Sequence, residues 1–242
     1  MDMAGGPKRK LKLLEGGQER WVELVGRLKY LGRWFQVGGD GDDALEERIQ
    51  AGWKQFWSHK GVLLERRLKE GPRTEYLQKM VSPVILFGTE SLELGPEQRG
   101  RIRTTRRQMM RMVRGKRYGG EREEESYEEA QLNYGDWLRG ATRELEEMVE
   151  ETGLKKWEEE ALRQKWRWTG HVLRRTGERP ARTAIQTLLE NRPRVVWGGH
   201  FRRWSKSFEE VLGGSWQNEA KDRQQWRLWS DEAIRFEPGL YR

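Results

Sequence analysis

Hydrophobic residues after position 41 recur every three or four residues, which is the spacing of amphipathic helices. Asp42 or Asp43 can cap the first of these helices. A second helix is expected over residues 73–87, interrupted at Pro83, and a third is marked by a narrow apolar stripe among the arginines that follow. Their apolar positions are Leu45, Ile49, Trp53, Phe56 and Trp57, then Leu77, Met80, Val81, Val84 and Ile85, then Ile102, Met109, Met110 and Val113. Three such helices with short connections predict a small bundle.

The C-terminal half has the same helical spacing. We expect helices over Trp137–Val149, Leu154–Leu173, a segment that begins near Pro180, Phe201–Leu212 and Trp216–Phe236. Pro180 suits the first turn of its helix, because that turn needs no amide hydrogen from it. These segments predict a second helical array.

Residues 21–37 have a different character. The segment WVELVGRLKYLGRWFQV is rich in β-branched and aromatic residues and ends in a Gly/Asp turn at residues 38–41. It predicts a β-hairpin. The expected fold is therefore mainly α, with an N-terminal β-hairpin, a three-helix bundle and a second helical array.

Charged residues divide the chain into blocks. Residues 99–117 carry nine Lys or Arg and no acid, whereas residues 121–129 are rich in Glu. We expect a disordered basic N-terminus at 1–20, the hairpin and bundle at 21–117, an acidic linker at 118–135 and a helical region at 136–242. The net charge of +8 favours a polyanionic partner. The alternative is that the blocks pair with one another.

The absence of cysteine and the scarcity of histidine exclude several kinds of chemistry. The chain has no cysteine, which removes disulfides, Cys nucleophiles and thiolate metal sites. Its three histidines form no pair at helical spacing, so we expect neither a metal site nor a cofactor. No apolar run approaches the roughly 20 residues of a membrane span, and no signal-peptide core is present. We expect an intracellular protein, in the nucleus or the cytoplasm, without a membrane partner.

Several short elements follow one another in a recognisable order. They are Lys29-Tyr30-Leu31-Gly32, a Gly/Asp turn, Arg48-Ile49, Val81-Ser82-Pro83-Val84-Ile85-Leu86-Phe87-Gly88-Thr89-Glu90, an Arg-rich helix, and Arg167-Trp168-Thr169-Gly170-His171-Val172-Leu173-Arg174-Arg175. This order resembles the reverse transcriptases of non-LTR (LINE-type) retrotransposons after their catalytic palm, and the last element resembles their downstream RWxGHvxR patch. The resemblance covers roughly residues 22–114 and 163–175. Phe87 stands where the family usually has Tyr, and Leu92 where Trp is common.

The resemblance implies a reverse-transcriptase thumb and downstream region without fingers and palm. In that family the KYLG strand leads from palm to thumb, and the next helices grip the template-primer duplex. Polymerisation needs palm carboxylates that hold two metal ions, and no Tyr-x-Asp-Asp element occurs here. The Asp42-Asp43 pair begins a helix, where capping is its expected role. We therefore expect that this chain is not an enzyme by itself.

The candidate nucleic-acid-binding residues are nine arginines. They are Arg101, Arg103, Arg106, Arg107, Arg111 and Arg114 in the Arg-rich helix, and Arg167, Arg174 and Arg175 in the downstream patch. The resemblance implies RNA or an RNA/DNA duplex as the partner, bound through its phosphate backbone. If about six phosphates are neutralised, the logarithm of affinity falls with the logarithm of salt with a slope of about −4 to −5. The alternative is a solvated basic face.

Aromatic residues in the downstream patch have two interpretations. Trp166 and Trp168 alternate with arginine and can stack on unpaired bases if exposed. Because Trp168 also fits the apolar stripe, we expect it in the core and leave Trp166 open. We expect His171 to be a hydrogen-bonding packing residue. The competing functions are a structural or protein-interaction helical protein that binds a protein partner through exposed Trp residues and, third, a nuclease with scattered carboxylates.

Overall fold

The structure of this chain is a computed structural model. It describes residues 10–15, 18–23, 27–30, 33–36, 42–92, 94–116, 118, 133–177, 179–191 and 196–236. Most described residues lie in helices, so the prediction of a mainly α fold is confirmed. None of the described helices combines the length and the apolar character needed to cross a bilayer.

Two antiparallel strand pairs precede the helices. Strand β1 (Lys10–Glu15) pairs with β2 (Gln18–Glu23), and β3 (Arg27–Tyr30) pairs with β4 (Arg33–Gln36). In the second pair Lys29 lies opposite Trp34. Strands β3 and β4 lie within the segment 21–37, for which the sequence predicts a hairpin. Strand β1 and the first residues of β2 lie in segment 1–20, for which the sequence predicts disorder.

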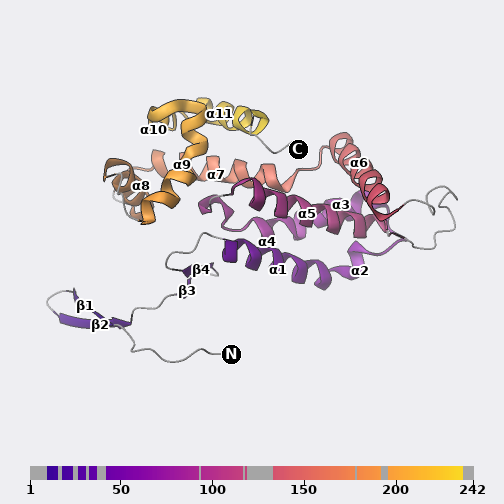
Figure 1. Cartoon of the computed structure of the whole chain (residues 1–242), viewed down its shortest axis with the longest axis horizontal. Helices are drawn as coiled ribbons and strands as arrows, with labels where there is room; N and C mark the ends of the chain where they lie inside the picture. Colours follow the sequence, from indigo (N-terminus) through magenta and orange to yellow (C-terminus); the bar gives the residue numbers. More distant parts are fainter. Residues whose placement is uncertain are drawn as a thin grey trace.

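The next helices pack around one shared core as a first bundle, drawn in purple in Figure 1. They are α1 (Asp42–Ser58), α2 (Lys60–Leu63), α3 (Glu70–Met80), α4 (Ser82–Leu86), the short 3₁₀ turn η1 (Thr89–Ser91) and α5 (Pro96–Arg114). The predicted second helix is divided at Val81, because Pro83 occupies the first turn of α4. Gly115 ends α5 with a φ of 76°, a left-handed conformation that glycine adopts without steric cost.

The remaining helices begin beyond the acidic segment. They are α6 (Tyr134–Thr152), α7 (Trp157–Arg174), α8 (Pro180–Asn191), α9 (Val196–Leu212), the 3₁₀ turn η3 (Gly213–Ser215), α10 (Trp216–Glu219) and α11 (Arg223–Phe236). The side chain of Asn133 caps α6 by accepting the amide of Asp136 at 3.0 Å. Figure 1 shows α7 between the purple α1–α5 bundle and the orange to yellow helices α9–α11.

Two hydrophobic clusters meet within α7. The first joins α1–α6 and the beginning of α7, through residues such as Phe56, Ile102 and Trp157. The second joins the rest of α7 to α8–α11 and is built largely from tryptophan, including Trp166 and Trp216. Helix α6 and the start of α7 therefore pack with the first bundle, although the sequence places the boundary between the two helical regions in the acidic segment 118–135.

Candidate functional site

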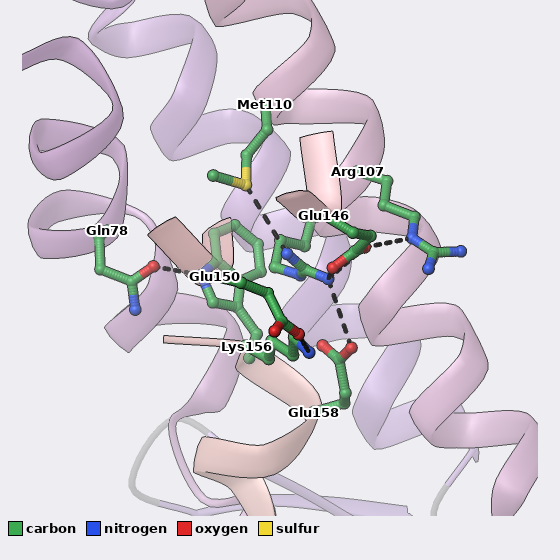
Figure 2. A network of polar contacts seen from close by, with 9 residues as sticks. Gln78, Arg107, Met110, Glu146, Glu150, Lys156 and Glu158 are labelled. Carbon is green, nitrogen blue, oxygen red and sulfur yellow. Dashed lines mark hydrogen bonds and ion pairs between the residues drawn. The ribbon is translucent and has the colours of Figure 1, made fainter. Parts of the chain in front are cut away.

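The most deeply buried arginine of α5 is Arg106, whose side chain has 0% exposure. Its Nη2 atom lies 2.7 Å from Oε1 of Glu146 on α6 and 3.5 Å from Oε1 of Glu158 on α7 (Figure 2). Arg107 reaches the same carboxylate, with its Nε 2.7 Å from Oε1 of Glu146. Arg106 therefore joins three helices and presents no surface to a ligand. The sequence predicts a nucleic-acid-binding role for Arg106, whereas the structure buries its side chain under α6 and α7.

Glu146 is the acceptor on which two arginines converge. Partial burial raises its pKa, but the charges and hydrogen bonds of Arg106 and Arg107 outweigh that effect and hold the pKa below the ordinary value of 4.5. In the same region the indole nitrogen of Trp157 donates to Oε1 of Gln78 at 2.8 Å (Figure 2). These contacts attach the start of α7 and the middle of α6 to the first bundle.

Other arginines of α5 also pair with carboxylates of the fold. Arg101 forms ion pairs with Glu46 and Asp42 of α1, and Nε of Arg114 lies 2.7 Å from Oε1 of Glu70 on α3. Arg101, Arg107 and Arg114 keep part of their side chains exposed. The hypothesis that charge blocks pair with one another therefore describes much of α5.

Arg103 and Arg111 lie half-buried on α5. Burial lowers the pKa of Arg111, Tyr134 acts in the opposite direction, and Arg107 lowers the pKa further. Among described residues Arg111 pairs with no carboxylate. Arg101, Arg106, Arg107 and Arg114 each pair with a carboxylate, so the positive charge of Arg111 is balanced less than theirs within the described part of the chain.

A groove runs along α7 and brings together two of the predicted arginines. Its volume is about 600 Å³, and it is lined by Glu90, Gln164, Arg167, Trp168, His171, Arg174 and Arg223. Five of these residues belong to α7, at positions separated by three or four residues, so they share one face of the helix. Glu90 comes from η1 and Arg223 from the start of α11. The groove therefore lies where α7 meets both neighbouring elements.

Arg174 and Arg223 are neighbouring cations in this groove. Partial burial lowers the pKa of Arg174, and the positive charge of Arg223 lowers it further, while Asp222 acts in the opposite direction. Nη1 of Arg174 donates to the carbonyl oxygen of Ala220 at 2.7 Å, which fixes the guanidinium. Neither arginine forms an ion pair with any residue in the described part of the chain. Two neighbouring cations, of which Arg174 feels the charge of Asp222 only partly in compensation, favour an anionic ligand.

The third cation of the groove is Arg167. Its side chain is 68% exposed and lies 3.6 Å from Glu160, one to two turns earlier on α7. The Glu160 side chain is only 10% exposed and also pairs with Lys155 at 3.5 Å, so Glu160 keeps a cationic partner when the exposed guanidinium of Arg167 contacts another group. Glu90 is the one carboxylate among the lining residues, against three arginines.

Gly170 shapes the groove from within α7. A Cβ atom added there would lie 2.5 Å from Nε1 of Trp226 and 2.7 Å from Nη1 of Arg174. Such separations are shorter than carbon and nitrogen atoms allow without displacement. Glycine at position 170 therefore lets α11 approach α7 and lets the Arg174 side chain fold back along its own helix.

The two tryptophans of the patch have distinct positions. Trp166 is 1% exposed, and its ring packs on Phe208 and Trp226 with centroid separations of 4.8 and 4.7 Å. Trp168 is half-buried and meets Trp204 edge-on, with centroids 6.1 Å apart. The question left open for Trp166 is thereby answered, since it belongs to the core. Trp168 packs on the second cluster as expected, but it also lines the groove.

His171 and Arg175 lie at the exposed side of α7. Nε2 of His171 lies 3.1 Å from Nε of Arg175, which donates to it. The expectation of a hydrogen-bonding packing residue is confirmed for the hydrogen bond and wrong for the packing, because His171 is exposed and lines the groove. Arg175 is exposed but is not among the lining residues. The backbone carbonyl of Arg175 accepts a hydrogen bond from Arg182.

Sequence reasoning missed three residues of the groove. Gln164 precedes Arg167 and Trp168 by one turn on the same face, so helical spacing alone carried a signal for it. Glu90 and Arg223 reach the groove from other elements, and their places depend on tertiary packing. No group of three or more histidine, aspartate or glutamate residues suited to hold a metal ion occurs in the described segments.

Comparison of the chain with protein-family models, with curated proteins and with solved structures found no match.

Proposed function

We propose that this chain binds nucleic acid, RNA or an RNA/DNA duplex, through the phosphate backbone and catalyses no reaction by itself. In this proposal β3–β4 and α1–α5 correspond to the hairpin and thumb that the sequence resemblance implies, and α6–α11 to the region downstream. The observation that carries the proposal is the groove, whose lining residues include three arginines, Arg167, Arg174 and Arg223, and one carboxylate. Guanidinium groups suit this role because their planar donors match phosphate oxygens.

Helix α5 makes a smaller contribution in this proposal than the sequence suggests. Arg111 is its foremost cation for a phosphate, supported by the exposed parts of Arg101 and Arg107. Arg106 is excluded by its burial. Three groove arginines that each neutralise one phosphate give a slope of about −2 to −3 in the logarithm of affinity against the logarithm of salt.

The test is a binding titration by fluorescence anisotropy with a labelled RNA/DNA duplex at several salt concentrations. Charge reversal of Arg223 to Glu is expected to weaken binding and to make the salt slope shallower. Arg227→Glu is the matched control, because Arg227 lies one turn farther along α11, is exposed, and does not line the groove. Equal losses in the two variants would assign binding to net charge rather than to the groove.

A structural or protein-interaction role is the second candidate. It is favoured by the ion pairs of Arg101, Arg106, Arg107 and Arg114, which use much of the basic helix within the fold. Trp57 and Phe87 are exposed apolar side chains that suit a protein partner. Absence of duplex binding by the wild-type chain at low salt would select this candidate.

A further inference from the structure

The groove along α7 combines a flat aromatic ring with cations, and this combination suits one particular form of nucleic acid. We propose that it takes an unpaired nucleotide, with the base stacked on Trp168 and the flanking phosphate on Arg174 and Arg223. This inference rests on the proposed nucleic-acid binding and specifies the substrate class of the same site. A base within a duplex presents only its edges, so a ring in a groove can stack only on a nucleotide that has left the stack.

The size of the groove agrees with this ligand. Its volume of about 600 Å³ lies within the usual range of small-molecule sites, roughly 300 to 1,000 Å³. Trp168 and Arg167 are followed one turn later on the same helix face by His171 and Arg174. A stacking ring and a cation one turn apart on one face suit a nucleotide, in which the sugar links the base to the phosphate.

The ring of Trp168 is held in place before any ligand binds. Trp204 meets it edge-on at an interplanar angle of 84°. Trp204 is itself fixed, because its indole nitrogen donates to the carbonyl oxygen of Glu90 at 3.2 Å. Trp204, which supports the ring of Trp168, therefore contacts Glu90, which lines the groove. A ring fixed in this way loses little conformational entropy when a base stacks on it.

The phosphate site is fixed as well. The hydrogen bond to Ala220 orients the guanidinium of Arg174, and Gly170 leaves the space in which that guanidinium lies. Arg223 lies close enough to lower the pKa of Arg174, so the two cations repel each other in the unbound chain. A phosphate bound to both removes this repulsion and accepts hydrogen bonds from both.

Two polar side chains face the same groove and can meet the edge of the base. Arg175 donates to Nε2 of His171, so a neutral His171 ring carries its proton on Nδ1 and has a donor to offer. The Gln164 amide supplies both donors and an acceptor. A side chain with both capacities accommodates more than one base, so the site recognises an unpaired nucleotide rather than one particular sequence.

The first experiment compares a blunt RNA/DNA duplex with the same duplex carrying a short single-stranded overhang, by anisotropy with the full chain. Wild-type protein is expected to bind the overhang probe roughly tenfold more tightly. Trp168→Leu is expected to abolish this preference without changing the affinity for the blunt duplex, and Trp168→Phe to retain most of it. Trp57→Leu is the control, because Trp57 is an exposed tryptophan on α1.

Three results decide between the two levels of the proposal. Equal affinity of the wild type for both probes, or an equal loss for both in Trp168→Leu, overturns the unpaired-nucleotide site and leaves backbone binding intact. Failure of the wild type to bind either probe overturns the proposed function itself. The tenfold preference, lost only in Trp168→Leu, supports both.

A second measurement uses only wild-type protein, so it does not depend on the folding of a variant. The overhang carries 5-iodouridine, is bound and irradiated, and the cross-linked peptide is mapped by mass spectrometry. Cross-links are expected in residues 164–174, with Trp168 as the foremost acceptor. Cross-links confined to other segments would overturn the proposed site.

Discussion

The indole nitrogen of Trp226 lies 2.7 Å from the carbonyl oxygen of Trp166 and donates a hydrogen bond to it. This bond brings α11 onto α7 beside Gly170, where the indole occupies the space that a side chain would fill. Arg223 precedes Trp226 by one helical turn, so the same contact carries Arg223 to the groove. The geometry of the proposed site therefore depends on how closely these two helices approach.

Replacement of Gly170 by Ala is expected to destabilise the chain. The new Cβ would lie 2.5 Å from Nε1 of the Trp226 indole, a rigid group held in the core. Overpacking of this kind costs about 1 to 3 kcal/mol in the free energy of unfolding. Urea denaturation followed by circular dichroism measures it. A Cβ at Gly140 meets nothing within 4 Å, so Gly140→Ala is the control and is expected to stabilise α6 by about 0.5 to 1 kcal/mol. Unchanged stability of Gly170→Ala would contradict the packing.

The two tryptophans of α7 are expected to differ sharply in their contribution to stability. Trp166→Ala removes a ring that is 1% exposed and leaves a cavity, at a cost of about 3 to 5 kcal/mol. Trp168→Ala is expected to cost clearly less, because that ring is half-buried and faces the groove. Thermal and urea unfolding of the two variants test the difference. A larger loss of stability in Trp168→Ala than in Trp166→Ala would contradict the burial of Trp166 in the core.

The stability of the chain is expected to depend on pH through Glu146. Its pKa in the folded chain lies below 4.5, so ionised Glu146 contributes stability above that pH, and the contribution is lost as pH falls through the folded pKa. Glu146→Gln is expected to lower the free energy of unfolding by about 1 to 3 kcal/mol at pH 7, because Arg106 loses a charged partner. The difference in the free energy of unfolding between Glu146→Gln and the wild type should become smaller as pH falls below 4.5.

The matched control for Glu146 is its neighbour Glu147, which is exposed on α6. Glu147→Gln is expected to have the stability of the wild type at every pH. Urea unfolding at pH 7, 5, 4 and 3 gives the comparison for all three proteins. A gap between Glu146→Gln and wild type that stays constant across this range would show that the carboxylate charge is not what stabilises the fold.

Helical spacing carried enough information to predict the mainly α fold. The stripe through Leu45, Ile49 and Phe56 is buried as its period requires. Local signals suffice for these features, because the contacts that decide them lie within a few residues. The division of the core inside α7 has no such signal, since it depends on which helices cover each half of α7.

The candidate site was predictable only in part, for the same reason. Arg167, Trp168 and Arg174 share one face of α7 by spacing alone. The burial of Arg106 was not predictable from the sequence of α5. That helix has few apolar residues, so some of its arginines face the helices that pack on it, and those helices are known only from the tertiary structure. Only the positions of Glu146 and Glu158, contributed by two later helices, make that burial tolerable.

Arg106 is expected to affect folding without affecting nucleic-acid binding. Arg106→Met leaves Glu158 buried without its ion-pair partner, at a cost of about 3 to 5 kcal/mol, whereas the salt slope of duplex binding stays at the wild-type value. Arg167→Met is the counterpart, expected to keep the stability and to make the slope shallower by about 0.7 to 0.9. If Arg106→Met is too unstable for titration, Arg106→Met with Glu158→Gln removes the uncompensated charge and restores folding. A shallower slope in that folded double variant, matching the change in Arg167→Met, would mean that α5 turns Arg106 outward when duplex binds.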